Sequence, residues 1–403
     1  MMISRPLSEV LQFIRGVTFT PEELVTGDKP GAIACLRTKN IQKELDDSDL
    51  LFVPASVVNR EEQRLREGDL LISSANSWEL VGKTVRVGKL SYSATAGGFI
   101  SILRPNPELI DPDYLFRFIS WERTQHEIRH LGRQTTNISN LDRQRFLELP
   151  IPLPSLTTQK HIAQVLEYAD CARWQAQQIE VELDTLVQAL FMERFGDYRQ
   201  RTPESFVSLA EVADVVSGVA KGSKLSGAVR TVPYLRVANV QDGFLDLSEI
   251  KEIEATERDI KKYRLKDGDI LMTEGGDFDK LGRGAMWSSE IAECIHQNHI
   301  FRVRLSEAYS PRFFECYLRT PMVKTYFLGC AKKTTNLASI NMSQLKALPT
   351  PKEPLDRQMH FVMAVQKIEA QRQVVIRQQL ELEQAFQSLI QRAFKGELMP
   401  KLA

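Results

Sequence analysis

Apolar residues recur at alternating spacings of four and three along two stretches of the chain, residues 156–195 and 355–394, which contain neither glycine nor proline. This spacing predicts a long helix that buries one stripe against another helix. At 1.5 Å per residue, a helix of about 40 residues would be about 60 Å long. The stripe positions are Val165, Ala169, Ala172, Ala176, Ile179, Leu183, Leu186 and Leu190 in the first helix, and Ala364, Ile368, Gln371, Val375, Gln378, Leu382, Ala385 and Leu389 in the second.

Two arrangements can bury these stripes. The helices can pair with each other, or each can pack as a surface helix on its neighbouring globular segment. We favour the pair, with Gln371 and Gln378 as polar residues that set its register. Because globular segments alternate with the helices along the chain, we expect an antiparallel pair and a pseudo-two-fold axis. This pairing leaves other helix faces available to partners, with Trp174, Phe191, Phe361 and Phe386 on them.

The remaining segments show short β-branched or alternating runs between glycine and asparagine turns, a pattern that predicts strands. Each segment also contains one run that begins with proline and predicts a helix. The expected strands are 70–73, 84–87, 99–103 and 300–305, and the expected helices are 112–119 and 311–318. The sequence therefore predicts an α+β protein with strand-rich domains at 1–155 and 207–354, a central long helix and linker at 156–206, and a C-terminal long helix at 355–403.

The second half of the chain repeats the first at an offset of about 199 residues. Residues 65–71 (LREGDLL) return as 265–271 (LKDGDIL). The Thr-Thr-Asn and Leu-Pro-x-Pro segments at 135–137 and 149–152 return at 334–336 and 348–351. A unit of this length can hold its own core, so the period does not indicate a solenoid. A duplicated module suggests a partner that also has two halves.

Composition narrows the class of protein only modestly. Lys and Arg total 52, as do Asp and Glu, so net charge gives no support for binding DNA, although a local basic face is compatible with this balance. The five cysteines lack Cys-x-x-Cys spacing and do not recur between the copies, a pattern typical of reduced, mostly buried thiols in the cytoplasm. We find no apolar signal core and no run of membrane-spanning length, so we expect a cytoplasmic protein without a membrane partner.

Catalytic signatures are incomplete. Gly82-Lys83-Thr84 matches the end of a phosphate-binding loop, but Ser77 stands where its first glycine should be. The Asn/Asp-Pro-Pro-Tyr/Phe tetrapeptide of amino-methyltransferases does not occur. His126 and His130 lack a nearby nucleophile, which favours a structural role. Core or loop roles are also favoured over a zinc site for Cys294, His296, His299 and Cys330, and over half a nuclease site for Asp277, Asp279 and Lys280.

The repeated motifs resemble those of one known family. They are the Gly-Asp turns, the Thr-Thr-Asn segments and the Leu-Pro-x-Pro exits, followed by the helix-entry residues Leu156, Gln159 and His161 with their counterparts Leu355, Gln358 and His360, and by the helix ends 195–197 and 394–397. In this order, and with each motif present twice, the chain resembles the specificity (S) subunit of Type I restriction–modification enzymes over essentially its full length.

The resemblance implies a non-catalytic subunit in which each domain is a target-recognition domain that reads one half of a bipartite, non-palindromic site in double-stranded DNA. The helices would set the spacer and dock two modification (methyltransferase) subunits. S-adenosylmethionine is expected on those partners, with no cofactor bound by this chain, and restriction (motor-nuclease) subunits would join for cleavage. The alternatives are a coiled-coil scaffold that binds two protein partners without reading DNA, and a stand-alone DNA-modifying enzyme.

Candidate site residues follow from divergence and recurrence between the copies. Divergent loops supply the base-reading candidates, because their side chains match base edges: Asn76, Ser77, Trp78, Lys83, Arg86, Asp277, Asp279, Lys280 and Arg283. Recurring polar and basic segments supply the candidates for contacts to the DNA backbone: Arg133, Gln134, Thr135, Thr136, Asn137, Lys332, Lys333, Thr334, Thr335 and Asn336. The seam of the helix pair is expected to use Val165, Ala169, Ile179, Leu183, Leu186, Leu190, Ile368, Val375, Leu382 and Leu389.

Overall fold

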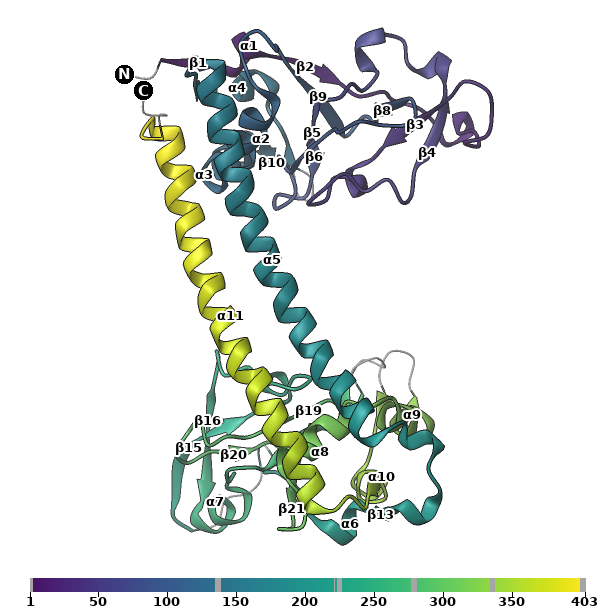
Figure 1. Ribbon diagram of the computed structural model, residues 1–403, viewed down its shortest axis with the longest axis vertical. Coiled ribbons are helices and arrows are strands. Elements are labelled where there is room, and N and C mark those ends of the chain that lie inside the picture. The colour runs from purple at the N-terminus through teal and green to yellow at the C-terminus, as the bar shows by residue number, and fades with distance from the viewer. Residues whose placement is uncertain are drawn as a thin grey trace. The chain divides into compact units, whose positions relative to one another are not determined.

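A computed structural model describes residues 3–134, 139–220, 222, 227–276, 281–333 and 338–398. The chain divides into two compact units, Met1–Ala176 with Gln378–Ala403, and Gln177–Arg377. Each unit holds one strand-rich part together with a portion of each of two long helices (Figure 1). These helices are α5 (Leu156–Phe195) and α11 (Leu355–Lys395), so the predicted extents of both helices are confirmed to within one residue.

The first unit is built on a four-stranded antiparallel sheet in the order β2-β9-β5-β7. A three-stranded sheet, β4-β3-β8, and two smaller sheets, β10-β11-β6 and β1-β12, complete it. The strands are β1 (Ser4–Pro6), β2 (Leu11–Arg15), β3 (Ala32–Leu36), β4 (Leu51–Pro54), β5 (Leu70–Ser73), β6 (Ala75–Asn76), β7 (Thr84–Arg86), β8 (Ala94–Ala96), β9 (Ile100–Pro105), β10 (Arg133–Gln134), β11 (Ser139–Asn140) and β12 (Pro150–Pro152). The helices besides α5 and α11 are α1 (Leu7–Val10), α2 (Pro112–Ser120), α3 (Glu122–Leu131) and α4 (Arg143–Leu147).

The second unit has the same strand order, with sheets β14-β21-β17-β19, β16-β15-β20, β18-β23-β22 and β13-β24. The strands are β13 (Phe206–Ser208), β14 (Ala213–Ser217), β15 (Val229–Leu235), β16 (Lys251–Thr256), β17 (Ile270–Thr273), β18 (Gly275–Gly276), β19 (Gly284–Met286), β20 (Ile295–His296), β21 (Ile300–Leu305), β22 (Lys332–Lys333), β23 (Ala338–Ser339) and β24 (Pro349–Pro351). Its shorter helices are α6 (Leu209–Val212), α7 (Glu257–Tyr263), α8 (Pro311–Leu318), α9 (Pro321–Cys330) and α10 (Met342–Lys346).

Local sequence explains why α2 and α8 begin where they do. Pro112 occupies the first turn of α2, and the Asp111 side chain accepts hydrogen bonds from the backbone N–H groups of Asp113 and Tyr114. Proline fits the first turn because its missing N–H has no partner there, and the aspartate satisfies two of the free donors. In α8, Pro311 likewise occupies the first turn, and the Ser310 side chain accepts one hydrogen bond, from the Phe313 N–H. Both proline-led helices predicted from the sequence are confirmed.

Both long helices bury aromatic residues in the domains. In the first unit, Phe394 of α11 packs against Tyr114, Phe118 and Trp121, with ring centroids 5.3, 5.3 and 5.5 Å away. In the second unit, Phe191 of α5 lies 5.5 Å from Phe313 of α8, with the two rings stacked. Aromatic burial on this scale makes each helix end part of a hydrophobic core.

The burial pattern corrects the expected use of the helix faces. We expected Phe191, Phe361 and Phe386 to be available to partners, but all three are buried. Trp174, expected on the same faces, is 46% exposed. Ile179 and Leu186, expected in the seam, are 44% and 48% exposed. The heptad spacing reflects helix–helix contacts alone, whereas α5 also turns Val187 and Phe191 toward the domain core.

The other seam candidates are buried or half-buried: Val165, Ala169, Leu183, Leu190, Ile368, Val375, Leu382 and Leu389. Gln371 and Gln378 are exposed, contrary to expectation, and Gln379 instead donates a hydrogen bond to the Ala176 carbonyl at 3.0 Å. Among the described residues, no helix is long and apolar enough to cross a membrane.

Candidate nucleic-acid interface

A small sheet in the first unit joins two candidate segments that lie far apart in sequence. Strand β11 pairs with β10 on one side and with β6 on the other, so that Ser139 lies opposite both Gln134 and Asn76. Strand β6 carries a base-reading candidate, and β10 consists of the backbone candidates Arg133 and Gln134. In the second unit, β23 joins β18 to β22 (Lys332–Lys333) in the same way. In the first unit, the base-reading candidate Asn76 and the backbone candidates Arg133 and Gln134 therefore lie on strands of one sheet.

The loop that follows β6 is held by its own side chains and by α3. Asn76 Nδ2 donates to Ser73 Oγ at 3.2 Å, and Asn76 Oδ1 accepts from the Ser77 N–H at 2.9 Å. The half-buried Trp78 ring meets the His130 ring edge-on at 5.8 Å. His126 in turn contacts His130, with ring centroids 4.2 Å apart and the two rings tilted by 36°. Through these contacts, His126 and His130 help to hold the loop in its conformation.

Lys83 is positioned by the glycine that precedes it. Gly82 has a φ of +85°, which favours glycine, and a Cβ on it would lie 2.6 Å from Ile128 Cγ2 of α3. Its carbonyl accepts a hydrogen bond from Gln125 Nε2 at 2.9 Å. The turn is thus pressed against α3, and it directs Lys83 Nζ to Gln42 Oε1 at 2.8 Å. A polar cleft of about 320 Å³ lies at this point, lined by Thr38, Lys39, Gln42, Ser73, Asn76, Leu80 and Lys83.

The loop that carries Gln42 is a part of this surface that the sequence reasoning missed. Asn40 is 1% exposed, accepts the Arg37 N–H at 2.7 Å, and donates to the carbonyls of Asp46 and Asp49 at 2.7 and 3.1 Å. A buried amide with three hydrogen bonds fixes the conformation of the loop. The signal was present as a repeated heptapeptide, Leu-Arg-x-x-Asn-Ile/Val-Gln, at 36–42 and 235–241.

The second unit builds the same arrangement, with arginine in place of lysine. Asn239 makes the bonds of Asn40, accepting the Arg236 N–H at 2.8 Å and donating to the Asp246 and Glu249 carbonyls at 2.8 and 3.1 Å. Arg283 takes the place of Lys83, and its Nη1 donates to Gln241 Oε1 at 3.2 Å. The cation and glutamine therefore meet in both units.

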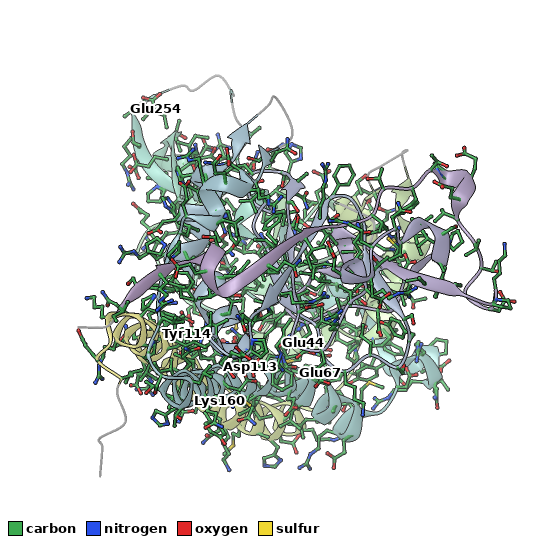
Figure 2. The ribbon with its side chains drawn as sticks, turned by 90° about the horizontal axis from the view of Figure 1, so that it is seen from above. Glu44, Glu67, Asp113, Tyr114, Lys160 and Glu254 are labelled. Carbon is green, nitrogen blue, oxygen red and sulfur yellow. The ribbon has the colours of Figure 1, made fainter. Side chains whose placement is uncertain are left out.

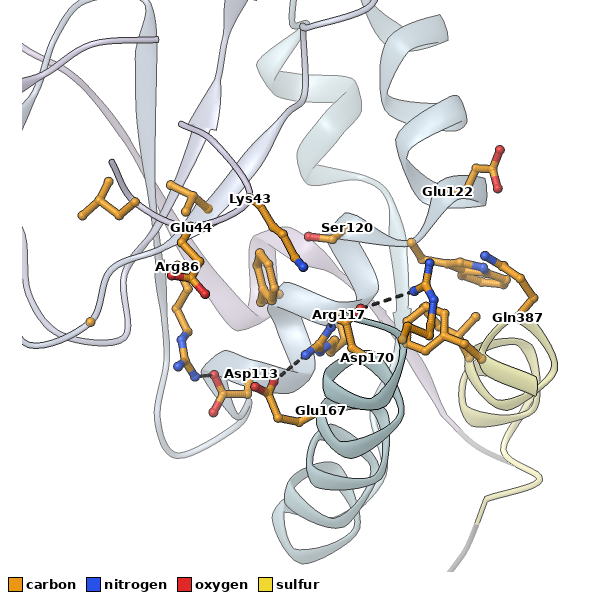
Figure 3. Close-up of a pocket in the computed structure, with 18 of the residues that line it drawn as sticks. Lys43, Glu44, Arg86, Asp113, Arg117, Ser120, Glu122, Glu167, Asp170 and Gln387 are labelled. Atoms are coloured by element: carbon orange, nitrogen blue, oxygen red, sulfur yellow. Dashed lines mark hydrogen bonds and ion pairs between the residues drawn. The ribbon is translucent and has the colours of Figure 1, made fainter. Parts of the chain in front are cut away.

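Arg86 lies elsewhere in the first unit. It forms an ion pair with Asp113 at the start of α2, and it is not among the residues that line the Gln42–Lys83 cleft. Figure 3 shows it in a depression of about 660 Å³ between loop 43–47, α2 and the long helices. Asp113 also lines a neighbouring depression with Lys160 of α5, and both are labelled in Figure 2. The structure thus places Arg86 apart from Asn76 and Lys83, which line that cleft.

A network of ion pairs near Arg86 connects α2 to the two long helices. Arg117 of α2 is 8% exposed and forms ion pairs with Glu167 and Asp170 of α5, the second at 2.8 Å. Arg173 bridges from Asp170, at 3.3 Å, to Glu383 of α11. Since its carboxylates already neutralise Arg117, this cluster fastens the helices to the domain and does not present a free cation to a ligand.

The histidines and cysteines considered for a metal site lie in different surroundings. His296 is fully buried in β20, and its Nδ1 lies 3.1 Å from the Ile300 carbonyl. Burial lowers the pKa of His296 to about 4 and raises the pKa of the Cys294 thiol to about 12. His299 is exposed, with its Nδ1 2.6 Å from Glu274 Oε2. Cys330 is half-buried and carries a free thiol.

Some candidates fall outside the described residues. These are Asp277, Asp279 and Lys280 among the base-reading candidates, and Thr135, Thr136, Asn137, Thr334, Thr335 and Asn336 among the backbone candidates. For Arg133, Gln134, Lys332 and Lys333 the strand pairing is described, but their side chains are not.

The sequence and the fold are similar to those of known proteins. Residues 4–183 match the family model of the Type I restriction modification DNA specificity domain. Two relatives match 98% of this chain and 88% of their own length. They are the Type I restriction enzyme EcoKI specificity subunit of Escherichia coli (strain K12), 26% identical, and the StySPI specificity subunit of Salmonella potsdam, 27% identical.

A solved structure shares the fold along the whole chain. It is described as the structural basis of complex assembly and conformational transition of the type I R-M system. The TM-score is 0.62, the sequence identity is 16%, and the match covers 98% of both chains. The chain is therefore similar to Type I restriction–modification specificity subunits along nearly its whole length.

Proposed function

We propose that this chain is the sequence-specific DNA-recognition subunit of a Type I restriction–modification complex, working without catalysis of its own. The observation that carries the proposal is that both units build the same polar surface, a cation and a glutamine held beside a small sheet, from equivalent chain positions. Equivalent surfaces with different side chains suit the reading of two different half-sites. The family match supports this function over that of a scaffold that does not touch DNA.

The two domains are proposed to be copies of one target-recognition domain, joined by an antiparallel helix pair that sets the spacer. The ion pairs within each unit support this direction. Arg173 of α5 pairs with Glu383 of α11 in the first unit, and Glu180 pairs with Arg372, at 3.3 Å, in the second. From the first ion pair to the second, the residue number rises along α5 and falls along α11, as expected for antiparallel helices. Two-fold-related readers meet the two strands of a duplex in equivalent ways.

The partners are proposed to be two modification subunits, docked on the long helices, which carry S-adenosylmethionine, with restriction subunits joining for cleavage in the cytoplasm. Exposed apolar residues on the helices, such as Tyr168 at 77% and Met363 at 55%, are compatible with such docking.

Methylome sequencing of cells that express the chain with its modification subunits tests the proposal. The expected result is one bipartite, non-palindromic methylated motif. Replacing residues 1–155 by the equivalent domain of another family member should change one half of the motif and leave the other half and the spacer unchanged. A chain that gives no methylated motif, or a replacement that alters both halves, would contradict the proposal.

A further inference from the structure

The two glutamine–cation pairs have a feature that goes beyond a polar surface. Each glutamine amide is held at both of its atoms. Gln42 Nε2 donates to the Lys39 carbonyl at 2.7 Å while its Oε1 accepts from Lys83. Gln241 Nε2 donates to the Ala238 carbonyl at 2.7 Å while its Oε1 accepts from Arg283. The two loops share this geometry although three of the residues before each glutamine differ, Thr38, Lys39 and Ile41 against Val237, Ala238 and Val240.

The hydrogen-bonding capacity that remains on each pair forms a defined pattern. A glutamine amide has two N–H donors and an oxygen with two lone pairs, so one donor and one acceptor remain beyond the bonds just described. The neighbouring cation retains further donors, since an ammonium has three and a guanidinium five. In order, the nitrogen, the oxygen and the cation therefore offer a donor, an acceptor and a donor.

This order matches one kind of base pair in the major groove. An A·T pair presents an acceptor, a donor and an acceptor, namely adenine N7, adenine N6 and thymine O4. A G·C pair presents two acceptors followed by a donor, and would leave one donor and one acceptor opposed by like groups. The pattern of the glutamine and its cation is therefore complementary to A·T and mismatched with G·C.

We propose that Gln42 with Lys83, and Gln241 with Arg283, each read one A·T base pair in the corresponding half-site. The glutamine contacts adenine N7 and N6, and the cation contacts thymine O4. This inference rests on the proposed function and names two specificity residues that the loop-divergence argument did not include. Because the glutamine recurs in both units, the two half-sites, although different, share an A·T pair at equivalent positions.

The first unit adds an apolar group beside the cation. Leu80 is 43% exposed and lines the same cleft as Gln42 and Lys83. Its carbonyl accepts the Lys83 N–H at 3.2 Å, so the two residues belong to one turn. In an A·T pair the thymine methyl group follows O4 in the groove, and apolar side chains contact that group. Leu80 is therefore placed to contact the thymine methyl group read by the first unit.

The support beneath each pair makes the contact specific. The buried Asn40 and Asn239 fix the glutamine loops, and Gly82 and Gly282 fix the cation turns against Ile128 and Phe327. A side chain already held in its binding geometry loses little conformational freedom when it binds, which favours discrimination between bases.

Selection from a duplex pool tests the inference, using the full chain assembled with its modification subunits. Gln42→Ala should lower the preference for A·T at one position of one half-site by about 5- to 150-fold. Gln241→Ala should do the same in the other half-site. If the wild-type complex selects no sequence, the proposed function itself fails. If the wild type selects a bipartite site but both variants keep every base preference, the recognition function stands and the glutamine inference is overturned.

A base analogue gives a second, independent readout. Placing 7-deazaadenine at the assigned position removes the N7 acceptor, so it should weaken binding by the wild-type complex but leave binding by the Gln42→Ala complex unchanged. Lys39→Ala is the matched control, since Lys39 lines the same cleft but pairs with Asp49. It should remain as sensitive to the analogue as the wild type. Should Gln42→Ala not fold, Lys83→Met tests the same pair through loss of the O4 contact. Equal sensitivity of wild type and Gln42→Ala to the analogue would refute the contact.

Discussion

Asp69 and Arg104 form a double hydrogen bond, from Arg104 Nε to Asp69 Oδ1 at 2.8 Å and from Nη2 to Oδ2 at 2.7 Å. The Asp69 side chain is 2% exposed, and it also accepts the Arg66 N–H at 2.8 Å. The aspartate of the repeated Gly-Asp turn thus closes its own turn and anchors it to β9. Asp269 and Arg304 make the same contact at 2.7 and 2.6 Å in the second unit.

Replacement of this aspartate should be strongly destabilising. Asp69→Ala leaves the Arg104 guanidinium, whose side chain is only 13% exposed, without its carboxylate, and we expect the free energy of unfolding to fall by about 3–5 kcal/mol. Arg5 and Glu9 form an exposed pair with side chains 47% and 49% exposed, so Glu9→Ala should cost about 0–1 kcal/mol. Urea unfolding of the wild type, Asp69→Ala and Glu9→Ala measures the difference in the free energy of unfolding. Similar midpoints for Asp69→Ala and Glu9→Ala would contradict the structural role of the turn.

Two aromatic residues on α5 should differ in their contribution to stability. Phe191 is fully buried among aromatic rings of the second unit, and Phe191→Ala should cost about 3–5 kcal/mol through lost burial and the cavity left behind. Tyr168 is 77% exposed on the same helix, and Tyr168→Ala should change stability by no more than about 0.5 kcal/mol. Thermal unfolding would disprove the packing if Phe191→Ala and the wild type unfolded together.

His296 makes the stability of the second unit depend on pH. Its pKa is about 4 in the folded state, because of burial, against an ordinary value of 6.5. In the unfolded chain the imidazole binds a proton first as the pH falls, so stability is complete above about pH 6.5 and is lost as the pH falls toward 4. The shift corresponds to a loss of about 3 kcal/mol.

The His296→Ala variant isolates this contribution, and the first unit already carries alanine at the equivalent strand position, Ala96. The variant should lose stability at neutral pH through its cavity, yet show a shallower decline between pH 6.5 and 4. Unfolding curves collected at pH 6.5 and pH 4 measure this decline in the free energy of unfolding. An equal decline in the variant and the wild type would count against burial of the neutral imidazole.

Contacts to the DNA backbone should separate from base reading in their salt dependence. Lys332→Ala with Lys333→Ala is expected to weaken binding to cognate and random duplexes alike, and to flatten the plot of log K against log salt by about 0.9 per lost phosphate contact. Arg283→Ala should instead cost roughly 1–3 kcal/mol on the cognate site alone. Anisotropy titrations on both duplexes at several salt concentrations provide the measurement, and equal losses for both variants would reject this division of roles.

Periodicity and repetition predicted most of the fold. The long helices, the proline-led helices and strands such as 70–73 and 300–305 follow from local patterns, and all are confirmed. The face of α5 that is buried could not be predicted in the same way, because Ile179 and Val187 are equally apolar and the domain core selects between them. Helix α3 also escaped prediction, since its single fully buried apolar residue, Ile128, gives almost no periodic signal.

The candidate surface was predicted in part. Lys83 and Arg283 were identified as divergent loop residues, but their partners Gln42 and Gln241 lie about 40 residues away and meet them only through the sheet order. The repeated heptapeptide Leu-Arg-x-x-Asn-Ile/Val-Gln marks both glutamines in the sequence. Arg86 shows the opposite limit, since only tertiary structure reveals that Asp113 neutralises it.

The first unit combines the beginning of the chain with its last segment, whereas the second unit is continuous from Gln177 to Arg377. During synthesis, the ribosome therefore completes the second unit before it makes Phe386, Ile390 and Phe394, which belong to the hydrophobic core of the first. The domain translated first must wait for the final helical turns to close its core. A premature stop after Arg377 would leave the second unit whole and the first without the residues that complete its core, so such incomplete chains should be cleaved by proteases more readily than the full chain.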